Sequence, residues 1–152
     1  MEVQYFRFEE DFVEDNVRCI PMIVRFKLDA CGIKLKLAEW SKFSTDQRRR
    51  LADLACETTL EVASYREHLT RLIKSVTNEN ATDLKANHNP QWEHVGEVPA
   101  VLIEKVKEMN LSLSLEQWRR LSKLERFALL KLSGNNHENK NFPKALKEFN
   151  LA

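Results

Sequence analysis

The feature that most constrains this chain is a stretch of sequence that occurs twice. Residues 21–54 align without a gap on residues 99–132, and nine of the 34 aligned positions are identical. Ordinary composition would give about two identities over this length. The identical pairs are Pro21/Pro99, Lys27/Lys105, Leu35/Leu113, Leu37/Leu115, Trp40/Trp118, Ser44/Ser122, Arg48/Arg126, Leu51/Leu129 and Leu54/Leu132. Self-similarity at a fixed spacing indicates a structural unit used twice.

Each copy predicts a leading helix. Its proline suits the first turn, where a missing N–H costs nothing. Gly32 and Asn110 suit the left-handed position at the end of the helix. Apolar side chains recur at i, i+4 and i+7, which places them on one buried stripe. The stripes are Val24, Leu28 and Cys31 in the first copy and Leu102, Val106 and Met109 in the second.

Two shorter helices are expected after the leading helix of each copy. An extended segment should carry the leucines at 35 and 37, or at 113 and 115, and a short helix should then hold Trp40 or Trp118 as a core anchor. Ser44 and Ser122 are each followed three residues later by Gln or Glu, the capping-box pattern for the start of a last helix.

The sequence therefore predicts an all-α fold, a single compact helical domain over 1–152. Only 3 Gly and 4 Pro are present, too few for a β-sandwich or barrel. The polar linker should turn at Asn89–Pro90 and dock through Trp92, and Asn141 should cap the last helix. The expected segments are an N-terminal arm (1–20), copy one (21–54), a long helix (58–76), a polar linker (77–98), copy two (99–132), and a loop with a C-terminal helix (133–152).

Charge and hydropathy exclude several function classes. The formal net charge is +1, so long-range attraction to nucleic acid or to an anionic membrane is weak. No apolar run reaches the roughly 20 residues of a membrane span. The acidic, aromatic start of the chain does not resemble a signal peptide. We expect a cytoplasmic protein without a nucleic-acid or membrane partner.

No catalytic or metal-binding motif is present. The chain has no H-E-x-x-H, Walker, G-x-G-x-x-G or G-x-S-x-G pattern. Cys19, Cys31 and Cys56 have no compact ligand spacing and are expected to be reduced thiols. Cys31 aligns with Met109, which indicates a packing position. We predict a protein that is not an enzyme and that holds no cofactor or metal.

Two segments mix polar and apolar residues more densely than folding alone requires. The first is 12–35, a strongly apolar stretch containing several charges, and the second is the loop 137–143. Each can also be explained by structure alone, through cations whose stems lie along a core helix and through turns and a cap. We take their side chains as candidates for partner binding: Arg18, Cys19, Arg25, Asp29, Lys34, His137, Glu138, Asn139, Lys140 and Asn141.

The same segments carry a resemblance that covers nearly the whole chain. The residues that carry it are Phe8–Glu9, Asp11–Val13, Arg18–Met22, Arg25, Lys27–Asp29, Cys31–Leu35, Trp40, Cys56, Ala81–Leu84, Trp118, Arg126–Leu129 and His137–Pro143. With them the chain resembles the nitrate reductase-associated protein family. It departs from the family pattern at Val17 and Ala55, where Leu and Pro are usual.

The resemblance implies an accessory role in nitrate assimilation. The family's genes lie beside those for assimilatory nitrate reductase and molybdopterin synthesis in oxygenic photosynthetic bacteria, so the implied partner is the molybdenum nitrate reductase or its maturation machinery. Two alternatives remain open: a protein that handles molybdopterin or an iron–sulfur cluster through Cys19 and Cys56, and, less favoured, a DNA-binding regulator. The oligomeric state and the contact surface are not determined by the sequence.

Overall fold

The computed structural model describes residues 5–9, 20–85, 90–134 and 141–152. The chain divides into two compact units, Met1–Asn87 and His88–Ala152, and each is described by itself. Helices dominate both, so the predicted all-α class is confirmed. Within the described ranges, every helix is too short or too polar to span a lipid bilayer.

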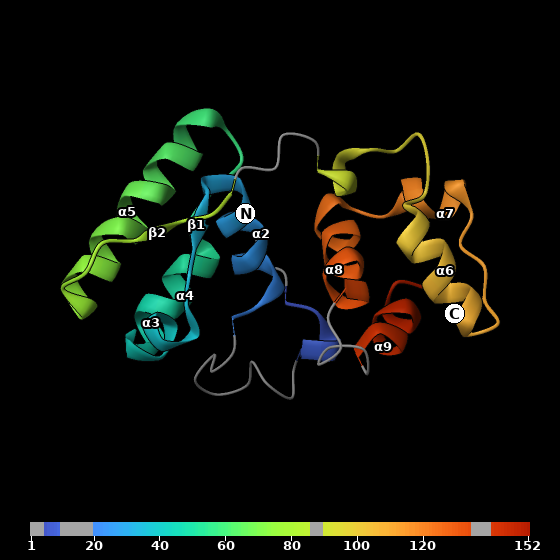
Figure 1. Ribbon diagram of the computed structural model, residues 1–152, viewed down its shortest axis with the longest axis horizontal. Helices are drawn as coiled ribbons and strands as arrows, with labels where there is room; N and C mark the ends of the chain where they lie inside the picture. The colour runs from blue at the N-terminus through green and yellow to red at the C-terminus, as the bar shows by residue number, and fades with distance from the viewer. Residues whose placement is uncertain (1–4, 10–19, 86–89, 135–140) are drawn as a thin grey trace. The chain divides into compact units, whose positions relative to one another are not determined.

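The first unit is built around its longest helix (Figure 1). Its elements are η1 (Arg7–Glu9), α2 (Met22–Cys31), β1 (Ile33–Lys34), α3 (Leu37–Lys42), α4 (Thr45–Asp53), α5 (Thr59–Thr77) and β2 (Thr82–Asp83). Helices α2 and α3 pack against α5, and α4 packs against α2. The predicted stripe Val24, Leu28 and Cys31 is buried in the core together with Tyr65 and Leu69 of α5.

In the second unit three elements pack on one helix. The elements are η2 (Gln91–Glu93), α6 (Ala100–Glu108), α7 (Leu115–Arg120), α8 (Lys123–Gly134) and α9 (Asn141–Glu148). Figure 1 shows α8 flanked by η2, α6 and α9, and all three pack against it. Trp92 of η2 meets Phe127 of α8 edge-on, with ring centroids 5.0 Å apart, so the predicted docking of this tryptophan is confirmed.

The helices of the two copies begin at equivalent positions. Met22, Leu37 and Thr45 start helices in the first copy, and the residues 78 positions later start α6, α7 and α8. Gly32 and Asn110 both have positive φ, 74° and 60°, as predicted. Both tryptophans are fully buried. These correspondences agree with the predicted duplication of 21–54 and 99–132.

The pair Arg48 and Arg126 performs one task in both copies. Each guanidinium lies over the ring of its copy's tryptophan, 5.7 Å from the centroid in the first and 5.8 Å in the second. Each also donates to carbonyl groups at the end of the short tryptophan helix: Arg48 to Trp40 and Ser41, and Arg126 to Leu121. A cation at a helix C-terminus satisfies its free carbonyls and complements its dipole.

Two local predictions need correction. Leu37 and Leu115 were expected in an extended segment, but each is the first residue of a helix. The reason is that hydrogen bonds fix the helix starts directly before them. The Lys36 backbone N–H donates to Glu39 Oε1 in the first copy, and Ser114 and Gln117 form a capping box in the second. Asn141 was expected to cap α9 and is instead its first residue. The capping boxes at Ser44 and Ser122 are confirmed.

The segment 77–98 contains two elements beside its polar turns. Strand β2 pairs antiparallel with β1, with Ile33 opposite Asp83 and Lys34 opposite Thr82. The 3-10 helix η2 follows at Gln91–Glu93. The predicted turn at Asn89–Pro90 lies partly outside the described residues. The single compact domain expected over residues 1–152 remains a prediction.

Candidate functional site

A carboxylate from the N-terminal arm holds the start of α2. Glu9 is 1% exposed, and its Oε1 accepts a hydrogen bond of 2.6 Å from the backbone N–H of Met22. Its Oε2 accepts one of 3.1 Å from Phe6 N–H. The N-cap residue, Pro21, provides no side-chain acceptor. A negative charge at the positive end of a helix dipole is stabilising, so Glu9 replaces the missing cap from a distance of 13 residues in sequence.

Replacing Glu9 with alanine is expected to lower the free energy of unfolding by about 1–3 kcal/mol, because two hydrogen bonds to a buried charged acceptor are lost. Urea unfolding followed by circular dichroism measures this change. Glu79→Ala, at an exposed carboxylate, is the matched control and should change stability by less than about 0.5 kcal/mol. Equal stability of the two variants would contradict the role assigned to Glu9.

A guanidinium from α5 holds the other end of α2. Arg66 Nη1 donates to the carbonyl groups of Cys31 and Gly32 at 2.8 and 3.0 Å. Its Nη2 donates to Asp83 Oδ1 of β2 at 2.5 Å. Gly32 has φ 74°, and a Cβ at that position would lie 3.4 Å from Arg66 Nη1. The helix end is therefore fixed to both α5 and β2.

Lys27 lies in the middle of α2 and is 5% exposed. Its Nζ donates hydrogen bonds of 2.6 Å to the carbonyl groups of Ala52 and Leu54, where α4 ends. It also lies 6.0 Å from the centroid of the Tyr65 ring. Burial lowers the pKa of Lys27, and the nearby Cys56, Asp53 and Glu57 oppose that shift. Buried lysines with a lowered pKa serve as bases or nucleophiles in some enzymes. The Lys27 ammonium instead donates hydrogen bonds to two main-chain carbonyls.

The groups around Lys27 are held in their protonated forms. Burial raises the pKa of the Cys56 thiol to about 12, with Cys31 adding to the shift and Lys27 opposing it. Burial also raises the pKa of Cys31. The pKa of Tyr65 is raised by burial, and its hydroxyl donates to the Leu51 carbonyl at 2.7 Å. Since the thiolate is the nucleophile and metal ligand, neither described cysteine is prepared for such chemistry near neutral pH.

The buried thiol predicts a loss of stability in alkali. Between pH 9 and about 12 the unfolded Cys56 loses its proton while the folded one keeps it, so stability falls as pH rises. One such proton gives a slope of roughly 1.4 kcal/mol per pH unit. Unfolding measured between pH 8 and 11 should show a shallower fall for Cys56→Ala than for the unchanged chain. Identical slopes would contradict the prediction, because Cys31 and Tyr65 contribute in both proteins.

The outer side of α4 carries a hollow of about 590 Å³. Leu54, whose carbonyl accepts a hydrogen bond from Lys27, is one of its lining residues. Among the described residues of its wall, two are cations and two are anions, so they favour neither sign of ligand. The lining residues are Asp46, Arg49, Arg50, Asp53, Leu54 and Ala55.

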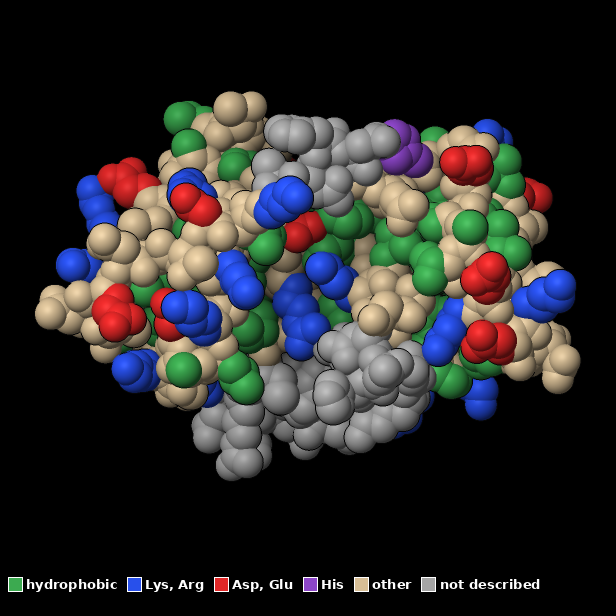
Figure 2. All heavy atoms as spheres, viewed as in Figure 1, with side chains coloured by type: hydrophobic (Ala, Val, Ile, Leu, Met, Phe, Trp, Pro, Cys, Tyr) green, Lys and Arg blue, Asp and Glu red, His purple; other side chains and the backbone are tan. Residues whose placement is uncertain are grey.

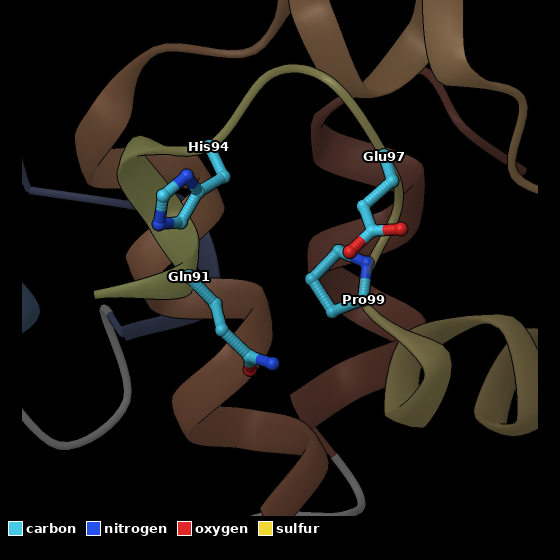
Figure 3. A pocket seen from close by; sticks show the side chains of 4 residues that line it. All are labelled: Gln91, His94, Glu97 and Pro99. Atoms are coloured by element: carbon cyan, nitrogen blue, oxygen red, sulfur yellow. The ribbon is translucent and has the colours of Figure 1, made fainter. Parts of the chain in front are cut away.

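The second unit has a smaller pocket of about 180 Å³ between η2 and the start of α6 (Figure 3). Figure 3 shows Gln91, His94, Glu97 and Pro99 around the opening. Two side chains hold the backbone of residues 92–94 beside the pocket. Trp118 Nε1 donates to the His94 carbonyl at 2.8 Å, and Arg126 Nε donates to the Trp92 carbonyl at 2.6 Å. The pocket is thus a fixed polar surface feature.

The predicted partner-binding residues fall into three places. Arg25 and Asp29 lie one turn apart on α2, both half-buried, and Arg25 Nε donates to the Ile20 carbonyl at 3.0 Å. Lys34 is exposed on β1. Asn141 is 7% exposed in α9 of the second unit. The structure therefore brings together only Arg25 and Asp29 among the described candidates. Arg18, Cys19, His137, Glu138, Asn139 and Lys140 lie outside the described residues.

Sequence reasoning did not single out Glu9, Lys27 or Arg66 as site residues, although they organise α2. One signal was available for Glu9, since a helix that begins after a proline needs an acceptor from elsewhere. Lys27 appeared only as one of the identities of the repeat and as part of the resemblance to the family. For Arg66 no local signal exists, because its partners are 34 and 35 residues away.

The described part of the chain was searched for side chains that could bind a metal ion together. Among the residues that the structure describes, His, Cys, Asp and Glu side chains nowhere form a group of three or more that could hold a metal ion.

A comparison with known families decides what kind of protein this is. The family model described as conserved nitrate reductase-associated protein matches residues 5–149. The chain belongs to this family. The resemblance predicted from the sequence is thereby confirmed, and the match spans both units of this nitrate reductase-associated protein, including Glu9, Lys27 and Arg66. No curated protein and no solved structure matches the chain.

Proposed function

We propose that this nitrate reductase-associated protein is a non-catalytic accessory or maturation factor for a cytosolic, molybdenum-dependent assimilatory nitrate reductase. It acts through a protein–protein surface. The observation that carries the proposal is the family match over residues 5–149, whose description names association with nitrate reductase. The redox chemistry then belongs to the metal centre of the partner, and this chain supplies binding and orientation.

The use of the reactive side chains in the first unit supports a non-catalytic role. Lys27 and Tyr65 hydrogen-bond to main-chain carbonyls, and Cys31 and Cys56 are buried thiols with raised pKa values. These groups stabilise helix ends and fill the core. The exposed charges are spread over helix surfaces and include simple i, i+4 pairs such as Arg120 with Glu116.

The surface that contacts the reductase is expected to include the exposed or half-exposed members of the predicted set. Lys34 and the half-buried pair Arg25 and Asp29 lie in the first unit, at and beside the C-terminal end of α2. Directional charged groups of this kind fix the register of a protein–protein contact. Lys34→Glu should therefore weaken association with the reductase without unfolding the chain.

Deletion of the gene tests the proposed function directly. We expect nitrate reductase activity in extracts to fall when the gene is removed and to return when the unchanged chain is supplied. Metal and pterin analysis of the purified reductase then separates a maturation defect from a defect in activity. Unchanged activity together with normal cofactor content would refute the proposal. The cofactor-handling alternative predicts a different result. This protein, freshly purified without oxygen, would contain molybdenum, pterin or iron, and the Cys56→Ser variant would lack it.

A further inference from the structure

Three side chains of α7 and α8 hold the segment that joins η2 to α6. Arg126 and Trp118 donate to the carbonyls of residues 92 and 94, and Arg119 Nε donates to the Val95 carbonyl at 2.8 Å. Three carbonyls within four residues are thus fixed by side chains from elsewhere in the second unit. A binding site whose backbone is already fixed loses little conformational entropy when a ligand enters. The pocket beside this segment is therefore preformed.

The size of this pocket suits one functional group. Its volume is about 180 Å³, below the roughly 300–1,000 Å³ of sites that hold whole drug-sized ligands. Figure 3 shows the side chains of Gln91 and His94 on one side of the opening, with Glu97 and Pro99 across from them. The first three residues are exposed and Pro99 is buried. A group that enters therefore meets polar side chains from both sides and one buried apolar ring.

The polar side chains of the pocket favour a cationic ligand that is rich in N–H groups. Glu97 contributes a carboxylate, which only accepts hydrogen bonds when ionised, and the Gln91 amide oxygen is a further acceptor. The segment 90–99 contains two glutamates and neither lysine nor arginine, so its own charge attracts a cation and repels an anion. Figure 2 shows acidic and basic side chains mixed over the displayed face around α6 and α7, so selection by charge is local to the pocket.

A guanidinium group meets these requirements better than an ammonium group. It is planar and carries five N–H donors in a fixed fork, so it can bond a carboxylate through two of them and a neighbouring acceptor through another. Its flat face also stacks on rings, and it is more weakly hydrated than an ammonium. The rings of His94 and Pro99 border the pocket. An ammonium is a compact, strongly hydrated point charge that exploits neither the fork nor the rings.

We propose that this pocket binds the guanidinium group of an arginine side chain on another protein. Glu97 accepts two hydrogen bonds from the group, the Gln91 amide oxygen accepts another, and the ring of Pro99 lies against its plane. Arginine is enriched at protein–protein interfaces and among the residues that contribute most of their binding energy. The site goes beyond the proposed function and does not depend on it, because it specifies a chemical group and not the nitrate reductase.

Titration of the full-length, isotope-labelled chain with capped amino acids, followed by nuclear magnetic resonance, tests the proposal. The probes are Nα-acetyl-arginine N-methylamide, its lysine analogue and its citrulline analogue, whose neutral urea group matches the guanidinium in shape. We expect the arginine probe to shift amide resonances between residues 91 and 100. It should bind at least about fivefold more tightly than the other two probes, because only the guanidinium combines a charge with the planar fork. Equal binding of the arginine and citrulline probes, or shifts confined to other residues, would overturn the proposal.

The variant Glu97→Gln separates the charge of the pocket from its shape. It keeps the size of the side chain and removes the carboxylate, so the arginine probe should bind about fivefold more weakly. The matched control is Glu108→Gln, at an exposed glutamate that ends α6. The control should bind within about twofold of the unchanged chain, because its charge lies about 12 Å along the helix from the pocket and is screened by salt. Equal binding by the two variants would contradict the role of Glu97.

A second titration distinguishes the source of the guanidinium group. Free L-arginine carries the same side chain together with a charged amino and a charged carboxylate group, whereas the capped probe imitates an arginine within a protein. We expect the capped probe to bind at least as tightly as free L-arginine. Tighter binding of free L-arginine would identify a small molecule as the ligand and overturn the assignment to a protein side chain.

Discussion

Replacing Trp40 with alanine is expected to lower the free energy of unfolding by about 3–5 kcal/mol, as for other buried aromatic residues cut back to alanine. The ring is fully buried, meets Phe43 edge-on at 6.1 Å between centroids, and lies under the Arg48 guanidinium. Its loss removes apolar burial, leaves a cavity and removes a cation–π contact. Urea unfolding followed by circular dichroism measures the loss, and Leu60→Ala, at an exposed leucine, is the control.

The corresponding variant Trp118→Ala extends this test to the single-domain prediction. The two substitutions lie in different units. If the chain unfolds as one domain, calorimetry should show a single transition that both variants lower. If the units unfold independently, each variant should lower one of two transitions and leave the other in place. A loss of less than about 1 kcal/mol for either variant would contradict the role of the tryptophans as core anchors.

The second large effect is expected at Lys27. Lys27→Met keeps most of the side-chain volume but removes the ammonium, so the Ala52 and Leu54 carbonyls at the end of α4 lose their donor. Hydrogen bonds from a charged donor contribute roughly 1.5–3 kcal/mol each. Relief of the cost of burying the charge, which is also what lowers the pKa of Lys27, offsets part of that loss. We expect a net loss of about 2–4 kcal/mol.

Lys107→Met is the control for this prediction. Lys107 lies in the last turn of α6 and is exposed. Substitutions at exposed positions usually change stability by about 0.5 kcal/mol or less. We therefore expect Lys107→Met to cost less than about 0.5 kcal/mol in the same denaturation experiment. Equal losses at both positions would show that the α4 carbonyls are not the cause.

The helices could be predicted because their signals are local. Ser44 and Ser122 predict the starts of α4 and α8 because Gln47 and Glu125, three positions later, complete a capping box. Gly32 predicts the end of α2 because glycine readily adopts the positive φ that it has there. The repeat strengthened each assignment by showing it twice. Local signals also explain one of the two errors, at Leu37 and Leu115. An apolar residue two positions after another apolar residue, as Leu37 follows Leu35 and Leu115 follows Leu113, fits an extended segment and the first turn of a helix equally well.

The long-range contacts could not be predicted in the same way. The pairing of β1 with β2 joins two-residue strands, too short for any period to appear. The hydrogen bonds from Lys27 to α4 and from Met22 to Glu9 depend on how elements pack, which no spacing in the sequence encodes. For the same reason the sequence indicated that 12–35 was unusual, but not that Lys27 within it serves the core.

The hydrogen bonds described for Glu9, Lys27 and Arg126 share a property that matters for the history of the family. All of them pair with main-chain atoms: N–H groups that donate to Glu9, and carbonyls that accept from Lys27 and Arg126. Every amino acid supplies the carbonyl, and every one except proline supplies the N–H. The residues that contribute these main-chain atoms can therefore change during evolution without loss of the bond, while the three charged residues cannot. Paired substitutions between relatives should be scarce at these contacts, so methods that infer proximity from correlated change would overlook the interactions that hold α2 and α8 in place.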